Sequence, residues 1–584
     1  MRVDLHLHSR ASGSATLWWM RRLGVESGDV RESYTPPEES YRMVKNAGMD
    51  FVTLTDHETI EGALSLTHNA DFFTGEEISA RFPEDGNYVD VLVYGLDDYD
   101  HRELQARRQD VYELVHYLRE AKLAHVLAHP MYAMPGPLDR TAVEKRLVLF
   151  GVWEFINGSR PAAQNHLSRE IAERVGPVEL RQMASRHGLQ VPPHRWISGT
   201  GGSDDHGGLY GGATHTLLPR ASSVEELLEA LAAGESRPAG EDGSVEKVAH
   251  TGFQIATGAI SENKEAGLTS ALRALLPSRL GPISTGAGDG RQQSLMKHVP
   301  ALARLGRFEA RATLAGVYER QVTAALGGAS TGFPALDFLS GIGGFIDGHV
   351  SIAPYLGVHG YFGRETGKAV SLRRELMPET SEEPRVGVFV DGLDGIHGVA
   401  TMYENLQDLA PEESGHLTLV RCGDTGDNIG DRTRSVRALT SLSVPLYDGL
   451  ELGVPSLLEV MELIASEEYR VLHVATPGPL GLAALISGLI LGIPVVGAYH
   501  TEFGAYARAL TNDPLVAEVV EVAVREFYER CSAVAVPSQA TALALRNRGY
   551  RIENFEVLKN GVDGALFHPK RRDPTLHDDL GGGN

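Results

Sequence analysis

Five short clusters of histidine and carboxylate residues occur in the N-terminal part of the chain, each near the end of an apolar segment. They are His6-Leu7-His8, Thr55-Asp56-His57, Gly75–Ser79, Ala128-His129-Pro130 and Gly202–His206. Strand alternation places His6 and His8 on the same face, within reach of one ion. Mixed nitrogen and oxygen ligands suit zinc, manganese or iron better than a thiolate site does. Together the clusters predict a metal centre.

Such a centre favours hydrolysis of a phosphoester. Clustered divalent cations lower the pKa of a bound water and neutralise the charge that develops on a phosphoryl oxygen. The sequence signals neither a Ser–His–Asp nor a Cys–His arrangement, and this chemistry needs no side-chain nucleophile.

Composition narrows the class of protein. The 584 residues carry a net charge of −23, which disfavours broad binding to nucleic acid. The two cysteines, Cys422 and Cys531, cannot build a disulfide framework and fit a reducing cytosol. Because the first nine residues lack the pattern of a secretory signal, we expect a cytoplasmic protein.

Residues 1–240 alternate apolar strands with helical stretches, which predicts an α/β fold with a largely parallel sheet or barrel. Its strand ends are where sites are built in such folds. The expected strands are Arg2–Leu7, Asp50–Thr55, Asp90–Tyr94, Ala124–Ala128, Val152–Ile156 and Trp196–Gly199.

Two further regions and a tail follow. Residues 241–383 are expected to form a mainly helical connector, and 571–584 a polar tail. Residues 384–570 begin with a strand, a glycine-bearing loop and a helix, and read as a doubly wound Rossmann-like domain. Its expected strands are Arg385–Val390, His416–Arg421, Val471–Ala475, Val495–Tyr499, Ala533–Val536 and Phe555–Leu558.

The apolar segment Ala475–Tyr499 is long enough to cross a bilayer. Pro477, Pro479 and Pro494 divide it into short pieces, so a buried β-α-β unit is the better interpretation. We therefore expect no integral membrane span.

The stretches DLHLHS, TDH, GEEIS, AHP and GSDDH, in this order over Met1–Arg220, resemble the motifs of the PHP (polymerase and histidinol phosphatase) superfamily. The resemblance implies a distorted β/α barrel that holds two or three divalent ions (Mn, Zn or Fe) and hydrolyses a small phosphoester, with Asp204 in a catalytic role. It implies these metal ligands: His6, His8, His57, Glu77, Asp90, His129, Asp204 and His206.

This sequence departs from the PHP pattern at two places. Gly13 and Ser14 stand where the family usually has an Asp or His ligand, which leaves a third metal without one of its ligands. Asp90 occupies a position usually held by histidine, and a carboxylate can ligate the same metals. We expect His57 and Asp90 at the periphery of the centre.

The stretches VFVDGLDGIHGVA, HVATPGPLGLAAL, IPVVGAYHTEF, AVAVPSQA and VLKNGVD, within Arg385–Pro569, resemble the N-terminal half of family-four glycosyltransferases of the GT-B class. The resemblance implies sugar transfer from a nucleotide-sugar to an acceptor, with His500 beside the reacting sugar as a catalytic residue. It implies that sugar-nucleotide or acceptor contacts come from Gly395, Gly398, His500, Ser538 and Asn560.

The pairing of these two parts resembles bacterial PHP-domain glycosyltransferases. No second Rossmann-like domain follows NGVD in this sequence, so we expect residues 385–569 not to transfer sugar unaided. The alternatives are a split enzyme with a separate donor-domain chain, a truncated remnant, and a non-catalytic binding or scaffold protein.

Overall fold

The structure, a computed structural model, divides into two compact units. Unit 1 comprises Met1–Glu382 with Ile490–Gly492, and unit 2 comprises Glu383–Leu489 with Ile493–Asn584. The description covers all residues except 13–30, 133–135, 137, 263–308, 328–333, 381–382, 393–401, 404–415, 424–431, 444–450, 560–567 and 572–584.

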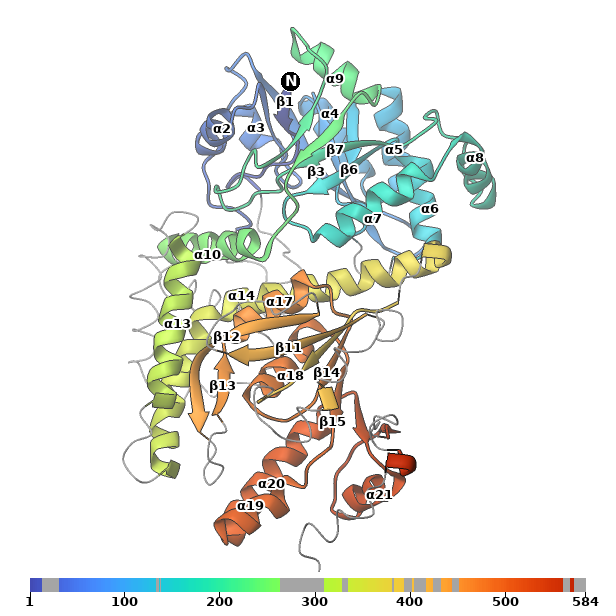
Figure 1. Ribbon diagram of the computed structural model, residues 1–584. Coiled ribbons are helices and arrows are strands. Elements are labelled where there is room, and N and C mark those ends of the chain that lie inside the picture. The colour runs from blue at the N-terminus through green and yellow to red at the C-terminus, as the bar shows by residue number, and fades with distance from the viewer. Residues whose placement is uncertain are drawn as a thin grey trace, which may run out of the picture. The chain divides into compact units, whose positions relative to one another are not determined.

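Nine strands of the described part of unit 1 form one mixed sheet in the order β7-β6-β5-β4-β3-β2-β1-β8-β9 (Figure 1). Their bounds are β1 (Arg2–Asp4), β2 (Phe51–Leu54), β3 (Phe72–Arg81), β4 (Tyr88–Tyr94), β5 (Ala124–Leu127), β6 (Val152–Asn157), β7 (Ser198–Gly202), β8 (Thr214–Leu217) and β9 (Arg237–Gly240).

The sheet of unit 1 is nearly closed into a barrel. Strands β1, β2 and β3 are parallel to one another, and so are β5, β6 and β7. The pairs β3–β4, β4–β5, β1–β8 and β8–β9 are antiparallel. The two ends approach each other where Gly201 N donates to Thr216 Oγ1 at 3.0 Å and Thr216 Oγ1 donates to Gly201 O at 2.8 Å.

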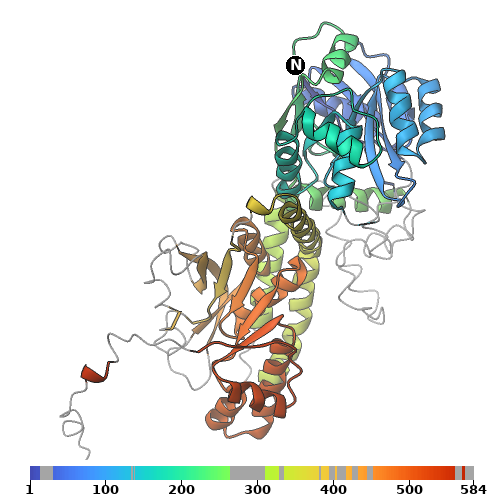
Figure 2. The same cartoon turned by 90° about the vertical axis from the view of Figure 1, so that its right-hand side faces the viewer.

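Helices cover the outside of this sheet (Figures 1 and 2). They are α2 (Pro37–Asn46), α3 (Glu61–Leu64), α4 (Asp98–Arg107), α5 (Val111–Glu120), α6 (Arg140–Leu149), α7 (Ala162–Glu173), α8 (Pro177–Arg186) and α9 (Val224–Ala232). Further along the chain, unit 1 contains α10 (Val245–Glu262), α13 (Glu309–Gly327) and α14 (Pro334–Leu376), and α14 packs against α6, α7, α10 and α13.

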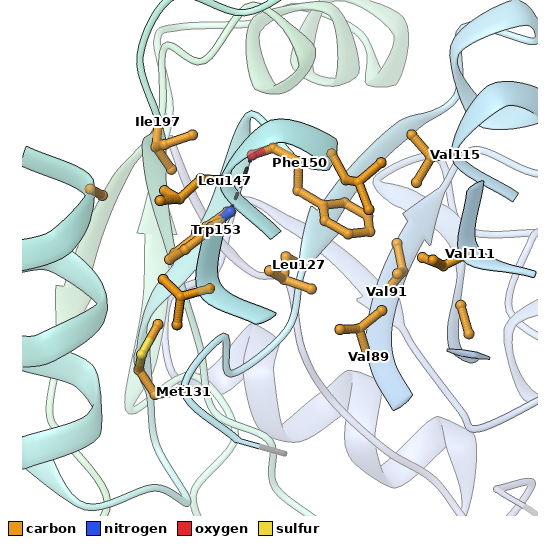
Figure 3. Close-up of a cluster of buried hydrophobic side chains, with 14 of the residues drawn as sticks. Val89, Val91, Val111, Val115, Leu127, Met131, Leu147, Phe150, Trp153 and Ile197 are labelled. Carbon is orange, nitrogen blue, oxygen red and sulfur yellow. Dashed lines mark hydrogen bonds between the residues drawn. The ribbon is translucent and has the colours of Figure 1, made fainter. Parts of the chain in front are cut away.

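The main core of unit 1 lies between the sheet and these helices. Figure 3 shows Trp153 of β6 among Leu127, Leu147 and Phe150, with its indole N–H donating to Phe150 O at 3.1 Å. Trp153 is completely buried, and so is its hydrogen bond. The indole therefore adds apolar burial without leaving an unsatisfied donor.

Eight described strands of unit 2 form a second sheet in the order β13-β12-β11-β10-β14-β15-β16-β17. They are β10 (Val386–Phe389), β11 (Leu417–Gly423), β12 (Thr433–Ser443), β13 (Glu451–Pro455), β14 (Val471–Val474), β15 (Val495–Ala498), β16 (Ala533–Val536) and β17 (Phe555–Val557). The accompanying helices are α17 (Leu457–Ser466), α18 (Pro479–Leu491), α19 (Phe503–Thr511), α20 (Pro514–Glu529) and α21 (Gln539–Asn547).

All pairs in this sheet are parallel except β12 with β13. The chain starts at β10 in the middle, builds outward through β11 and β12, and returns to β14 on the other side. This is the doubly wound order, in which ligands bind where the winding reverses. The predicted fold class, a barrel-like α/β unit with a Rossmann-like unit, is confirmed.

Several predicted strands differ from those observed. β1 ends at Asp4, so His6 and His8 lie just beyond it, and β12 and β13 were not predicted. The segment Ala475–Tyr499 contains α18 and β15 as expected, and no helix in the described part of the chain has the length and apolar character needed to cross a membrane.

Candidate functional sites

The predicted metal ligands converge at one place in unit 1. His6 and His8 follow β1, His57 follows β2, His129 follows β5, and Asp204 and His206 follow β7. Glu77 and Asp90 do not lie at strand ends as the sequence suggested, but in the middle of the paired strands β3 and β4. Their side chains nevertheless reach the histidines, since both carboxylates approach His129 Nε2.

Glu77 is at the centre of this cluster. Its Oε2 lies 3.0 Å from His6 Nε2 and 3.2 Å from His8 Nε2 and from His57 Nε2. Its Oε1 lies 3.3 Å from His129 Nε2. One buried carboxylate therefore contacts four histidines, which come from three segments of the chain.

Asp204 forms the second anionic group. Its Oδ1 lies 3.5 Å from both His6 Nε2 and His8 Nε2, and 3.4 Å from His206 Nδ1. Asp90 lies farther out, with Oδ2 4.0 Å from His129 Nε2. His57, which was expected at the periphery, contacts Glu77 as closely as His8 does.

Four groups of three residues bring their ligand atoms within 4.8 Å of one another. They are His6 with His8 and Glu77, His6 with His129 and Asp204, Glu77 with Asp90 and His129, and His8 with His57 and His206. All eight ligands predicted from the PHP resemblance belong to at least one group.

Two neighbours that the sequence did not reveal orient the histidines. Glu154 of β6 accepts from His6 Nδ1 at 3.0 Å, and Ser12 Oγ lies 3.1 Å from His8 Nδ1. Both contacts leave the Nε2 atoms directed at the cluster, as the polar neighbours of metal-bound histidines do. A glutamate inside the otherwise apolar segment Val152–Ile156 is the signal that could have revealed Glu154.

The donor set fits divalent cations. His8 Nε2 and Glu77 Oε1 are buried and make no hydrogen bond within the described part of the chain. Burial opposes ionisation of Glu77, but His57 and His6 outweigh it and hold the pKa of Glu77 well below its usual value. Burial likewise opposes ionisation of Asp204, and His6 and His8 lower its pKa well below the usual value. Two buried carboxylates need positive charge beside them, which either the histidines or a bound divalent ion can supply.

The backbone is strained at two of these residues. His129 has φ 29° and Asp204 has φ 50°, in the left-handed region that residues with a Cβ rarely adopt. Strain of this kind clusters at functional sites, where the surrounding structure enforces it.

The acidic neighbours of the candidate ligands have other partners. Glu76 points to the opposite side of β3, where it contacts His101 Nδ1 at 2.9 Å and accepts from Gln105 Nε2 at 2.8 Å. Asp205 accepts the backbone N–H groups of Gly207, Leu209, Tyr210 and Gly211 and thereby closes the loop after β7.

A third acidic residue, missed from the sequence, does reach the cluster. Glu32 is buried, and its Oε2 lies 3.5 Å from His57 Nε2. Gly13 and Ser14, where a ligand was expected to be missing, lie outside the described residues.

In unit 2, a small network lies at the carboxyl ends of the parallel strands. The hydroxyl of Tyr403 is 2.7 Å from His473 Nε2 and 3.2 Å from His500 Nε2. Asp391, directly after β10, accepts from Leu480 N at 2.8 Å and from Gly481 N at 3.1 Å at the start of α18. These residues mark the point where the winding reverses between β10 and β14.

Within the described part of the chain, the other residues predicted for sugar transfer are not seen at the Tyr403 network. Ser538 caps α21, because its Oγ accepts from Thr541 N at 3.1 Å. Gly395, Gly398 and Asn560 lie outside the described residues.

Comparison with known families concerns unit 2. Residues 396–565 match Glycosyltransferase Family 4. The C-terminal part of the chain is a Glycosyltransferase Family 4 domain. This glycosyltransferase domain has the Rossmann-like sheet described above.

Curated relatives are similar over part of their length. A GDP-mannose-dependent alpha-mannosyltransferase of Corynebacterium glutamicum is 29% identical over 23% of this chain and 32% of its own length. One of Mycobacterium tuberculosis is 27% identical over 32% of this chain and 49% of its own. A sulfoquinovosyl transferase of Arabidopsis thaliana is 24% identical over 36% of this chain and 41% of its own length. The chain thus spans between about a third and a half of these relatives' length.

Solved structures with a distant likeness include an amidohydrolase from Chromobacterium violaceum, with 18% identity and a TM-score of 0.25 over 40% of this chain and 97% of that one. Another, described as a metal-dependent phosphoesterase from Bifidobacterium adolescentis, has 15% identity and a TM-score of 0.22 over 40% of this chain and 96% of that one.

Proposed function

We propose that unit 1 is a metal-dependent phosphoesterase that holds two or three manganese, zinc or iron ions and hydrolyses a small phosphoester. The observation that supports it most directly is Glu77, whose two oxygens lie 3.0 to 3.3 Å from four histidine Nε2 atoms. A divalent cation here would activate water and neutralise charge on the phosphoryl group.

The protein's own residues would hold and orient these ions. Glu77 would supply carboxylate oxygens to hold them, since Oε2 lies beside His6 and Oε1 beside His129. Asp204 would be the second anionic ligand, and the carboxylate of Glu154 would fix the ring of His6. Because imidazole and carboxylate ligands are mixed, the set suits zinc, manganese or iron.

The test is metal content combined with hydrolysis. The purified chain, reconstituted with manganese, is analysed for metal and assayed against a panel of phosphomonoesters and nucleotides. We expect at least two ions per chain and hydrolysis that is lost with a chelator or with Asp204→Ala, but retained with Asp98→Ala, which removes an exposed carboxylate outside the cluster. Less than one ion after reconstitution, or activity that survives Asp204→Ala, contradicts the proposal, and an empty cluster would favour a binding or scaffold protein.

We also propose that residues 385–569 supply the acceptor side of sugar transfer from a nucleotide-sugar, with His500 beside the reacting sugar. Membership of Glycosyltransferase Family 4 and the position of His500 near the reversal of winding support this role. The chain is incubated with UDP- and GDP-sugars while nucleotide release is followed. Release that His500→Ala abolishes would indicate a complete transferase, no release would fit an acceptor-side role, and release that is equal in the variant contradicts a role for His500.

A further inference from the structure

The long helix α14 is part of the core of unit 1. Its residues Ala369 and Leu372, and Met377 just after it, belong to the same buried cluster as Leu147 and Trp153 of the barrel. This part of α14 is therefore fixed against the unit that carries the candidate metal centre, although it lies about 200 residues further along the sequence from β6.

Two residues of α14, one turn apart, reach side chains beside that centre. Tyr361 Oη accepts from Arg160 Nη1 at 2.6 Å. Glu365 is 2% exposed, and its Oε2 accepts from Gln164 Nε2 at 2.8 Å. Both partners lie just after β6, in the segment where Ser159 Oγ donates to Asp204 O at 2.9 Å.

Arg160 connects this helix with the cluster. Its guanidinium carbon lies 4.0 Å from the centre of the Tyr132 ring, and Nη2 lies 3.9 Å from Asp204 Oδ2. The other oxygen of Asp204 lies 3.5 Å from His6 Nε2, so one carboxylate separates the guanidinium from the histidines.

The position of Arg160 leaves binding capacity for a ligand. The side chain is 15% exposed, and its Nε makes no hydrogen bond within the described part of the chain. A separation of 3.9 Å from Asp204 is longer than the charge-assisted hydrogen bond that an arginine and a carboxylate form when nothing restrains them. Tyr361 and Tyr132 both contact the guanidinium, and at 3.9 Å Asp204 forms no hydrogen bond with it.

We propose that Tyr361 is a positioning residue of the N-terminal site: it holds the Arg160 guanidinium where it binds an anionic oxygen of the substrate, so that α14 completes the site. The inference rests on the proposed phosphoesterase function for its substrate class, a phosphomonoester. Arginine suits this role because its planar fork binds two phosphate oxygens at once, and a guanidinium already held in place loses little freedom on binding.

The first test is Tyr361→Phe in the full, metal-loaded chain. Removal of one hydroxyl should raise KM for 4-nitrophenyl phosphate and the Kd for inorganic phosphate, measured by calorimetry, by about tenfold, with kcat nearly unchanged. Metal content should not change. The matched control is Tyr355→Phe on the same helix, because its hydroxyl contacts His250 Nε2 at 2.9 Å and not Arg160.

The second test is a double-mutant cycle. Arg160→Gln should weaken phosphate binding, Arg160→Lys should rescue it only in part because lysine lacks the fork, and Tyr361→Phe should add nothing in the Arg160→Gln background. Thermal unfolding of each variant shows whether it is folded, and Arg160→Lys tests the site even where Tyr361→Phe is unstable.

Three results would overturn the inference: phosphate binding unaffected by Tyr361→Phe, an undiminished effect of Tyr361→Phe without Arg160, or no phosphate binding by the metal-loaded chain. Phosphate binding that depends on Arg160 and Tyr361, without hydrolysis of any phosphomonoester, would support the inference and contradict the proposed activity. Hydrolysis of a phosphomonoester with KM and kcat unchanged by Tyr361→Phe would support the proposed activity and contradict the inference.

Discussion

Glu32 and His57 face each other at the edge of the histidine cluster, with Glu32 Oε2 3.5 Å from His57 Nε2. Glu32 is buried, and its Oε2 makes no hydrogen bond within the described part of the chain. Burial raises the pKa of Glu32, although His57 and His8 act in the opposite direction. An acidic oxygen buried without a hydrogen bond is costly, unless a cation joins it there.

We therefore predict that Glu32 is a ligand of an ion held by His57 and His206. Glu32→Gln keeps the shape of the side chain and removes its charge. It should lower the metal content of the reconstituted chain by about one ion, measured by elemental analysis after dialysis. Glu39→Gln, which changes an exposed glutamate of α2, is the control and should retain full occupancy. Equal metal content in both variants would exclude Glu32 as a ligand.

The adjacent residues Glu76 and Glu77 provide a paired test of the cluster. Glu77→Gln should abolish tight metal binding and lower hydrolysis at least about 100-fold, because Glu77 contacts four histidines. Glu76→Gln should do neither. Burial raises the pKa of Glu76 to about 7 against the contrary effect of His101, so glutamine mimics its protonated form. Loss of metal in both variants would mean that the strand, and not the carboxylate, is responsible.

The histidines of the cluster could be predicted from the sequence because each lies in a short motif that can be recognised without knowledge of the fold. His6 and His8 were predicted from their His-x-His spacing at the end of the first apolar segment, and His57 and His129 from their positions shortly after later ones. Glu77 and Asp90 were predicted as ligands only from the family resemblance, and their position inside β3 and β4 was not predicted, because alternation alone does not tell where a strand begins and ends.

Glu32, Arg160 and Tyr361 could not be predicted in the same way. Glu32 belongs to none of the five motif clusters, so no motif spacing identifies it. Tyr361 is 201 residues from Arg160, and only the packing of α14 on the barrel core brings them together. Such contacts depend on tertiary structure, which periodicity does not encode.

In unit 2, Asp391 stabilises the start of α18 from a different segment. Besides Leu480 N and Gly481 N, it accepts from Thr476 Oγ1 at 3.1 Å. Asp391→Ala should lower the free energy of unfolding of unit 2 by about 2 kcal/mol, and Asp391→Asn by less because an amide oxygen still accepts. The two cysteines of the chain, Cys422 and Cys531, both lie in unit 2, so their labelling in increasing urea reports its unfolding. Equal stability of the alanine variant and the wild type would contradict this role.

The last prediction concerns the pH dependence of the same unit. Burial, with a smaller effect of His500, lowers the pKa of His473 from 6.5 to about 4. The unfolded chain therefore binds more protons than the folded one between these values, and the stability that neutral His473 contributes is present above pH 6.5 and lost as the pH falls toward 4. The full shift corresponds to at most about 3 kcal/mol.

Urea unfolding, followed by labelling of the cysteines with 4,4′-dithiodipyridine, which reacts with thiols in this pH range, should show that the free energy of unfolding of unit 2 falls from pH 7 to pH 4.5. His473→Gln cannot take up a proton, so its decline should be smaller, whereas replacement of the exposed His416 by glutamine should leave the wild-type decline. An identical decline in the wild type and His473→Gln would assign the acid sensitivity to other groups.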